Sequence, residues 1–191
     1  MALDPQSLRI VRYPDPILRR KAAPIEAVTD EVRAVAERMI QLMHEAEGIG
    51  LAAPQVGLPW RMFVAHVPPT EASRNEPGRA LGTDPMTATA EPTVYINPVL
   101  SKPIGAPEPF TEGCLSLPDI SGDVLRPPTI TITATDLSGR EFTQTGTGLL
   151  ARCWQHEYDH LDGVLIIDRM TQLSRIKNRS AIRDLERSAA H

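Results

Sequence analysis

Long apolar runs, a signal sequence and clustered positive charge are all missing from this chain. No stretch approaches the roughly 20 apolar residues that a helix needs to span a bilayer. The N-terminus "MALDPQSLRIVRYPDPILRRK" has no apolar core of a signal peptide, so we expect a cytoplasmic protein without a membrane partner. The net charge is −4 and there is no extended basic stretch, so we do not expect the chain to bind DNA.

Cysteine is also scarce. The chain has only two cysteines, Cys114 and Cys153, which is enough for at most one disulfide. In a reducing cytosol, free thiols or metal ligands are the better interpretation of both residues. Each cysteine is therefore a candidate ligand.

What the chain does contain fits one domain of mixed composition. Its 191 residues are 41% hydrophobic and 23% charged, which is enough for a buried core and far from the composition of disordered chains. No internal repeat divides the sequence. We therefore predict a single domain over residues 1–191.

Hydrophobic periodicity predicts helices at both ends of an antiparallel β region. Apolar residues recur at helical spacing after two candidate N-caps, Thr29 and Asp30, until Gly48 ends the pattern, which predicts a helix over 30–46. Strands are predicted at 61–67, 94–100, 129–135 and 141–145, the last two joined as a hairpin by "DLSGR". The Pro/Thr/Ala-rich segment 68–93 is predicted to be a flexible surface loop.

The segment "HEYDHLDGVLI", residues 156–166, carries a chemical signal. Its first five letters match HExxH, in which two histidines bind a metal ion and the glutamate serves as a base. The longer protease pattern HExxHxxGxxH continues to Gly163, but Ile166 stands where its third histidine ligand belongs. Either this segment is not a metal site, or its third ligand lies elsewhere in the chain.

The motif falls on a helix that is predicted to begin after Gly148. One stripe of this helix contains two apolar residues and both histidines: Leu149, Cys153, His156 and His160. Histidines four residues apart have Cβ atoms about 5–6 Å apart, close enough to bind one ion. Glu157 can then lean toward an open coordination position and act as a general base.

A solvated polar helix face without a metal is the alternative for these residues. Against it, unpaired imidazoles on a stripe with apolar neighbours would cost free energy unless a ligand satisfied them. We therefore favour a metal site.

Four candidates for the third ligand have little support in the sequence. Glu186, the only glutamate downstream, lies in a charged tail that is expected to be solvated. Cys153 is on the correct stripe but would crowd three ligands along one helix, so a small buried apolar residue is the better interpretation. His44 and His66 belong to the predicted first helix and a predicted strand, and nothing in the sequence distinguishes either.

Cys114 is the remaining candidate. It lies in "TEGCLSLPDISG", with a glycine before it and a proline after it. A thiolate presented there from a strand end would complete a Cys-plus-two-His set and leave a fourth position for water. A buried thiol without a metal is the alternative.

Three stretches together resemble the signature motifs of the peptide deformylases. They are "GIGLAAPQ" at 48–55, "EGCLS" at 112–116 and "QHEYDH" at 155–160, in the same order and nearly letter for letter. The likeness covers most of the chain and is weakest over 68–93 and beyond about residue 170. It implies an α+β fold in which antiparallel and mixed sheets pack around a central HExxH helix, with an N-terminal helix and a C-terminal helix or tail over 171–191.

The resemblance also implies a role for each motif residue. The implied metal ligands are Cys114, His156 and His160, and the implied ion is divalent, natively Fe²⁺, with Zn²⁺, Ni²⁺ or Co²⁺ as substitutes. The implied catalytic groups are Glu157 as general base and acid, and the Gln55 side chain and Leu115 backbone N–H as donors to the oxyanion. The expected substrate contacts are Ile49, Gly50, Glu112 and Gly113.

The implied reaction is hydrolysis of the N-formyl group of an initiator formyl-methionine, with formate as a product. A zinc endopeptidase of the HExxH type is the alternative enzyme, and a non-catalytic metal-binding or ribosome-associated module is a third class. The C-terminal tail offers four cations for a transient ribosome contact: Arg175, Lys177, Arg179 and Arg183. Asp184 and Glu186 in the same tail favour a solvated helix instead.

Overall fold

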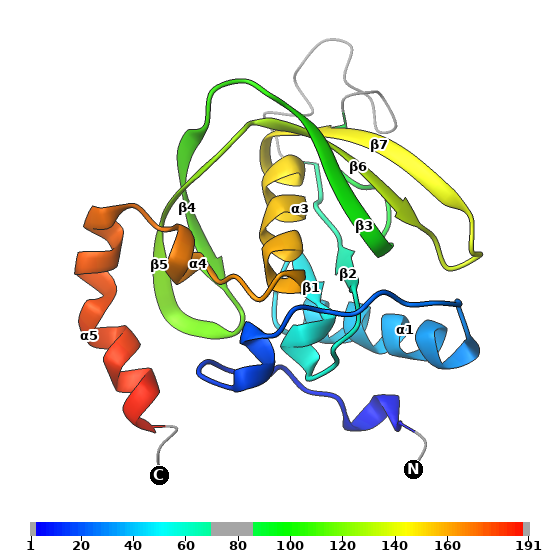
Figure 1. Ribbon diagram of the computed structural model, residues 1–191, viewed down its shortest axis with the longest axis horizontal. Coiled ribbons are helices and arrows are strands. Elements are labelled where there is room, and N and C mark those ends of the chain that lie inside the picture. The colour runs from blue at the N-terminus through cyan, green and yellow to red at the C-terminus, as the bar shows by residue number, and fades with distance from the viewer. Residues whose placement is uncertain (1–2, 70–85, 189–191) are drawn as a thin grey trace.

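The computed structural model describes residues 3–69 and 86–188, which form two antiparallel sheets with helices around them (Figure 1). The strands are β1 Gly50–Ala52, β2 Met62–Ala65, β3 Thr93–Ile104, β4 Glu108–Cys114, β5 Leu117–Arg126, β6 Thr129–Thr135 and β7 Glu141–Thr147. The α-helices are α1 Asp30–Glu45, α3 Gly148–Leu161, α4 Ile166–Arg169 and α5 Gln172–Ser188. The 3₁₀ helices are η1 Pro5–Ser7, η2 Pro16–Arg19 and η3 Ala53–Val56. The predicted α+β class is confirmed.

The larger sheet has the strand order β1-β2-β3-β6-β7, and every neighbouring pair is antiparallel. The predicted hairpin is β6 and β7, whose turn is closed by Asp136 accepting the backbone N–H groups of Ser138 and Arg140. β1 lies at one edge of this sheet, so its outer side pairs with no strand among the described residues.

Helix α1 confirms the predicted first helix to within one residue. Thr29 caps it by accepting the backbone N–H of Val32 at 3.3 Å, and its apolar face packs against β1 and β2. The helix ends at Glu45, where the chain turns so that the Gly48 N–H reaches the Met43 carbonyl at 2.8 Å. The first motif therefore begins directly where α1 ends.

Helix α3 packs against strands of the larger sheet and lies between that sheet and the β4–β5 pair (Figure 1). Its Trp154 is fully buried, and the ring centroid is 5.7 Å from that of Tyr95. A Cβ atom at Gly146 of β7 would come within 2.5 Å of the Trp154 ring, so a glycine there allows the close approach of helix and sheet. The two histidines of α3 are thus held on a well-packed element.

The smaller sheet is the β4–β5 hairpin, whose turn follows Cys114. β5 alternates between buried and exposed residues from Ile120 to Arg126, so that the Arg126 side chain faces inward with the apolar ones. The predicted strands did not include β4 and β5, because Pro118 and Gly122 obscure this alternation.

The end of α3 follows the prediction. Gly163 has φ +72° just past the C-cap residue Asp162, a conformation that favours glycine. Ile166 is 2% exposed and begins α4, so it is a core residue rather than a ligand. The predicted C-terminal helix is α5. No helix within 3–69 and 86–188 combines the length and apolar character needed to cross a membrane.

Most of the predicted loop over 68–93 lies outside the described residues, which resume at Met86. From there the chain is held against the larger sheet. The Met86 N–H donates to the Thr145 carbonyl at 2.7 Å, and Thr89 exchanges two hydrogen bonds of 2.9 Å with Val67. Residues 86–89, near the end of the segment that was predicted to be a flexible surface loop, are therefore hydrogen-bonded to the fold.

Candidate metal centre and active site

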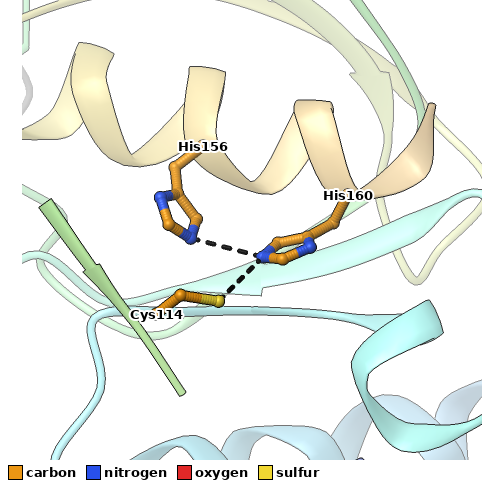
Figure 2. A group of neighbouring side chains, drawn as sticks. All are labelled: Cys114, His156 and His160. Atoms are coloured by element: carbon orange, nitrogen blue, oxygen red, sulfur yellow. Dashed lines mark hydrogen bonds between the residues drawn. The ribbon is translucent and has the colours of Figure 1, made fainter. Parts of the chain in front are cut away.

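Three candidate ligand atoms meet between β4 and α3 (Figure 2). The Sγ of Cys114 lies 3.3 Å from Nε2 of His160, which lies 3.3 Å from Nε2 of His156. A tetrahedral ion with one sulfur and two nitrogen ligands needs these atoms roughly 3.3–3.6 Å apart, given bonds of about 2.3 and 2.0–2.1 Å. In the part of the chain that the structure describes, no other group of three or more His, Cys, Asp or Glu is so close.

The turn of the β4–β5 hairpin positions Cys114. It is the last residue of β4 and pairs with Leu117, whereas Gly113 pairs with Ser121, so the register shifts here and leaves residues 118–120 of β5 without partners. We attribute the position of Cys114 beside α3 to this tight end of the hairpin, which brings the predicted third ligand to the two histidines.

The other four candidates for the third ligand lie outside this group. Cys153 is 4% exposed, and its Sγ lies 3.4 Å from the Ile49 carbonyl, which agrees with the interpretation as a buried thiol. Glu186 lies on α5 and accepts a hydrogen bond from the N-terminal segment. His44 and His66 contact each other, with ring nitrogens 3.1 Å apart.

A buried carboxylate orients the first histidine. Glu112 Oε2 lies 3.1 Å from Nδ1 of His156, which leaves Nε2 to face the other two ligand atoms. A carboxylate on one ring nitrogen fixes the tautomer and orientation of a metal-binding histidine. The Glu112 side chain also accepts two hydrogen bonds from Arg126, of 2.7 and 3.0 Å, and one of 2.8 Å from Arg152. Because these partners occupy it, we infer that Glu112 orients His156, beyond the substrate contact expected from the sequence.

Arg126 extends this network to α4. It donates to Asp159 at 2.8 Å, and Asp159 accepts a second hydrogen bond of 2.8 Å from Arg169. Glu112, Arg126 and Asp159 are all buried and paired with opposite charges, which offsets the cost of removing them from water. The network therefore ties β4, β5, α3 and α4 together behind the histidines.

We expect this network to make the fold sensitive to acid. Burial alone would raise the pKa of Glu112, but hydrogen bonds from His156 and Arg126 and the Arg126 charge hold it well below its ordinary value of 4.5. A carboxyl with a depressed folded pKa contributes stability that is present above its unfolded pKa and lost as the pH falls. The urea midpoint should therefore drop steeply below about pH 4.5.

Glu112→Gln tests the origin of that acid sensitivity. At pH 7 the variant should lose about 3 kcal/mol of unfolding free energy, because Arg126 keeps its buried charge without its carboxylate partner. Its midpoint should then change less with pH than that of the wild type. Glu141→Gln, an exposed position on β7, is the matched control and should behave like the wild type. An unchanged acid dependence in Glu112→Gln would contradict the role given to the network.

Glu157 is a buried carboxylate next to the ligand histidine on α3. It is 4% exposed, and among the described residues its Oε2 has no hydrogen-bond partner. Burial raises the pKa of Glu157 to about 7, against the opposing charges of His156 and Arg126. A group with such a pKa can accept and return a proton near neutral pH, which is what a general base requires.

The side-chain amide of Gln55 is held with its N–H₂ group toward Cys114. Gln55 Oε1 accepts the backbone N–H of Ala52 at 2.8 Å. Its Nε2 therefore points the other way, donating to Ser116 Oγ at 3.3 Å and lying 3.6 Å from Cys114 Sγ. The fold thus directs amide N–H groups to the place where the ligand atoms meet.

A cavity of about 580 Å³ opens beside these groups. Its lining includes all four expected substrate contacts and the expected backbone donor: Ile49, Gly50, Glu112, Gly113 and Leu115. Apolar side chains of the β4–β5 hairpin complete the wall, among them Phe110 and Ile120. A hollow of this size can hold a short apolar side chain and the adjoining peptide backbone.

Gly50 is required by a neighbouring side chain. A Cβ atom there would lie 2.4 Å from Glu157 Oε1, whereas a Cβ at Gly113 would have no atom within 4 Å. Gly50→Ala should therefore displace the Glu157 carboxylate and lower kcat by roughly tenfold or more, since a small misplacement of a catalytic group costs much activity. Gly113→Ala is the matched control and should retain the fold and bound metal, as checked by circular dichroism and elemental analysis. Wild-type kcat in Gly50→Ala would show that the contact does not position Glu157.

Four residues that support the site were not predicted from the sequence: Ser116, Arg126, Arg152 and Asp159. A usable signal existed for one of them. Arg126 occupies an inward position of the alternating pattern in "ISGDVLR", where a charged residue needs a buried partner. The partners of the other three come from distant segments, which no local pattern reveals.

Comparison with known proteins agrees with the resemblance that the three sequence motifs indicate. Residues 7–176 match the polypeptide deformylase family. Peptide deformylase 2 of Gloeobacter violaceus is 45% identical over 156 residues, covering 82% of this chain and 75% of that protein. The peptide deformylase of Maricaulis maris is 38% identical over 179 residues, covering 94% of each.

Solved structures agree. The fold is similar to a peptide deformylase of Plasmodium falciparum in complex with an inhibitor, with a TM-score of 0.78 and 35% identity, covering 94% of this chain and 99% of that one. It is also similar to the peptide deformylase of Ehrlichia chaffeensis, with a TM-score of 0.81 and 31% identity, covering 96% and 97%.

Proposed function

This chain belongs to the polypeptide deformylase family, and on that premise we propose that Cys114, His156 and His160 hold its metal ion. It is a hydrolase that removes the N-formyl group from newly made polypeptides, and the endopeptidase alternative is not favoured. The ligand assignment is supported mainly by the short distances between one thiol and two imidazoles, which lie beside the buried Glu157. We further propose that residues 1–191 act as one catalytic domain.

The donor set fits a divalent ion. A thiolate and two neutral imidazoles suit Fe²⁺ or Zn²⁺ and leave one coordination position open. Burial and the neighbouring His156 charge lower the pKa of His160 well below its ordinary value. Burial opposes a charge on His156 as well, but its hydrogen bonds with Cys114 and Glu112 raise its pKa well above the ordinary value, so ion binding would have to release that proton. The unpaired Oε2 of Glu157 is a further sign that a polar molecule belongs beside the ligands.

Glu157 is the proposed general base and acid. When bound, the ion would lower the pKa of a water molecule toward about 7 and polarise the formyl oxygen. Glu157 would accept the proton that this water loses on attacking the formyl carbon, and would then pass it to the leaving amine nitrogen. Its pKa of about 7 suits both transfers.

Two N–H groups are proposed to stabilise the oxygen that gains negative charge. One belongs to the Gln55 side chain, which the Ala52 N–H and Ser116 hydroxyl hold in place. The other is the backbone N–H of Leu115, in the turn after Cys114. Removing one donor of this kind costs roughly 10²–10³ in kcat in other amide hydrolases.

The substrate would lie along the edge of β1 that pairs with no strand among the described residues. Because Gln55 already takes the Ala52 N–H, an extended peptide would pair with the remaining outward backbone groups of β1. Ile49 and Leu115 line the adjacent cavity with apolar surface, which suits the flexible thioether of methionine. We propose that this edge, with Gly50 and Gly113 beside it, binds the formyl-methionyl end of the chain.

The proposed function is tested with two peptides. Metal-loaded protein is incubated with formyl-Met-Ala-Ser and, separately, with unformylated Met-Ala-Ser. We expect formate release from the first with its peptide bonds intact, and no reaction with the second. Cleavage within the peptide would support an endopeptidase, and no reaction with either peptide would support a non-catalytic module.

We propose Fe²⁺ as the native ion. A thiolate ligand suits Fe²⁺ but leaves both iron and sulfur open to oxidation. Iron-loaded protein should therefore lose its deformylase activity in air, whereas nickel- and zinc-loaded protein should keep theirs over the same period. The measurement is formate release against time of aeration, after anaerobic purification and elemental analysis. Equal air stability of the three forms would contradict this assignment.

A transient contact with the ribosome is proposed for α5. Four of its cations are exposed: Arg175, Lys177, Arg179 and Arg183. Exposed cations bind RNA phosphates in a salt-dependent manner. Co-sedimentation with ribosomes at low salt that is lost at moderate salt would support the contact. We propose a cytoplasmic location, where such a contact would bring the enzyme to emerging nascent chains.

A further inference from the structure

His44 and His66 come from different elements and meet at the surface. His44 lies in the last turn of α1, and His66 directly follows β2. Nε2 of His44 is 3.1 Å from Nδ1 of His66, and the ring centroids are 5.3 Å apart with 66° between the ring planes. The fold has therefore paired two residues that the sequence did not distinguish.

This pair repeats the geometry of the two histidines in the metal centre. For His156 and His160 the nitrogen distance is 3.3 Å, the centroid distance 5.0 Å and the interplanar angle 67°. Neighbouring nitrogens on one ion are roughly 2.9–3.4 Å apart for bonds of about 2.0–2.1 Å and angles of about 90–109°. Both pairs fall in this range, so the surface pair can also hold one ion between its rings.

The surroundings of the pair favour a cation that exchanges with solvent. His44 is exposed and lies at the C-terminal end of α1, where the helix dipole attracts positive charge. In the described ranges, no third His, Cys, Asp or Glu joins the pair, so water would complete the coordination. Imidazole ligands select Zn²⁺, Ni²⁺ or Cu²⁺ over Mg²⁺ and Ca²⁺. Without a thiolate, this site would bind more weakly than the Cys114 centre.

We propose that His44 and His66 form a second, exchangeable site for a divalent transition-metal ion, independent of the proposed function. The site is next to the substrate cavity in the structure. The His66 backbone N–H donates to the Ile49 carbonyl at 2.9 Å, and Ile49 lines the cavity. An ion there would link the end of α1 to the segment after β2, which is hydrogen-bonded to the residue that precedes β1.

Zinc titration by calorimetry tests the proposal. Protein without a histidine tag, already carrying one zinc per chain, is titrated with Zn²⁺. We expect one further zinc per chain, and we expect His44→Gln and His66→Gln each to lose it while keeping the first. His191→Gln, which removes the remaining one of the chain's five histidines, is the matched control and should bind both. Cys114→Ala should lose the tight zinc and keep the weak one.

A spectroscopic readout on the unaltered chain identifies the atoms. Long-range ¹H–¹⁵N spectra should show the second zinc shifting Nε2 of His44 and Nδ1 of His66, with little change at the partner nitrogens of the same rings. The proposal is overturned if wild-type protein takes up no second zinc, if the second zinc persists in either glutamine variant, or if these two resonances do not move.

Discussion

Glu157→Gln should abolish most formate release while leaving one metal ion bound. The amide keeps the size and burial of the side chain but cannot accept the proton that the attacking water loses. General acid and base catalysis contributes about 10²–10⁴-fold, so kcat should fall by that factor. We expect kcat to fall and the metal content to stay the same, because Glu157 is not one of the three residues whose ligand atoms cluster. Formate assays and elemental analysis of the same samples measure both quantities.

Tyr158→Phe is the matched control for this variant. Tyr158 is the next residue on α3; the Arg61 guanidinium carbon lies 4.8 Å from its ring centroid, and Tyr158 is not among the residues that line the cavity. The control should retain kcat to within a few fold. If Glu157→Gln kept wild-type kcat, or lost activity only because it lost the ion, Glu157 would not be the general base.

Cys114→Ala should lose both the metal and the activity, whereas Cys153→Ala should keep both. The first variant removes one of the three clustered ligand atoms, and the second removes a buried thiol outside the cluster. Cys153→Ala should cost about 1 kcal/mol of unfolding free energy, the usual size for a small core truncation. Metal content per chain, formate release and urea unfolding separate the two outcomes.

The reverse pattern would refute the ligand assignment. A Cys153→Ala protein without metal, or a Cys114→Ala protein that still bound one equivalent tightly and released formate, would place the third ligand elsewhere. Because the two cysteines are matched in chemistry and both line the cavity, each is the control for the other.

Prediction succeeded where the determining residues are close in the chain. The helical spacing of His156 and His160 placed both imidazoles on one face, and α3 shows them 3.3 Å apart. The helix cap at Thr29 and the alternation in "TITITAT" similarly located α1 and β6 to within a residue. In each case local backbone geometry decides the outcome, so a short window of sequence is sufficient.

Prediction failed where the determining contacts are distant. Glu112 contacts His156 and Arg152 on α3 and Arg126 on β5, and the sequence suggested only a substrate contact. The pairing of His44 with His66 depends on how α1 packs against β2, which no periodicity describes. Cys114 was identified through its motif. Its irregular position at the end of a hairpin could not have been predicted from the spacing of residues in the sequence.

X-ray absorption at the zinc edge, on protein loaded with one zinc per chain, tests the ligand set most directly. We expect one sulfur at about 2.3 Å and two imidazole nitrogens at about 2.0–2.1 Å from the zinc. The sulfur contribution should vanish in zinc-treated Cys114→Ala and persist in Cys153→Ala. A wild-type spectrum without sulfur, or one whose sulfur disappears with Cys153, would contradict the Cys114, His156 and His160 centre.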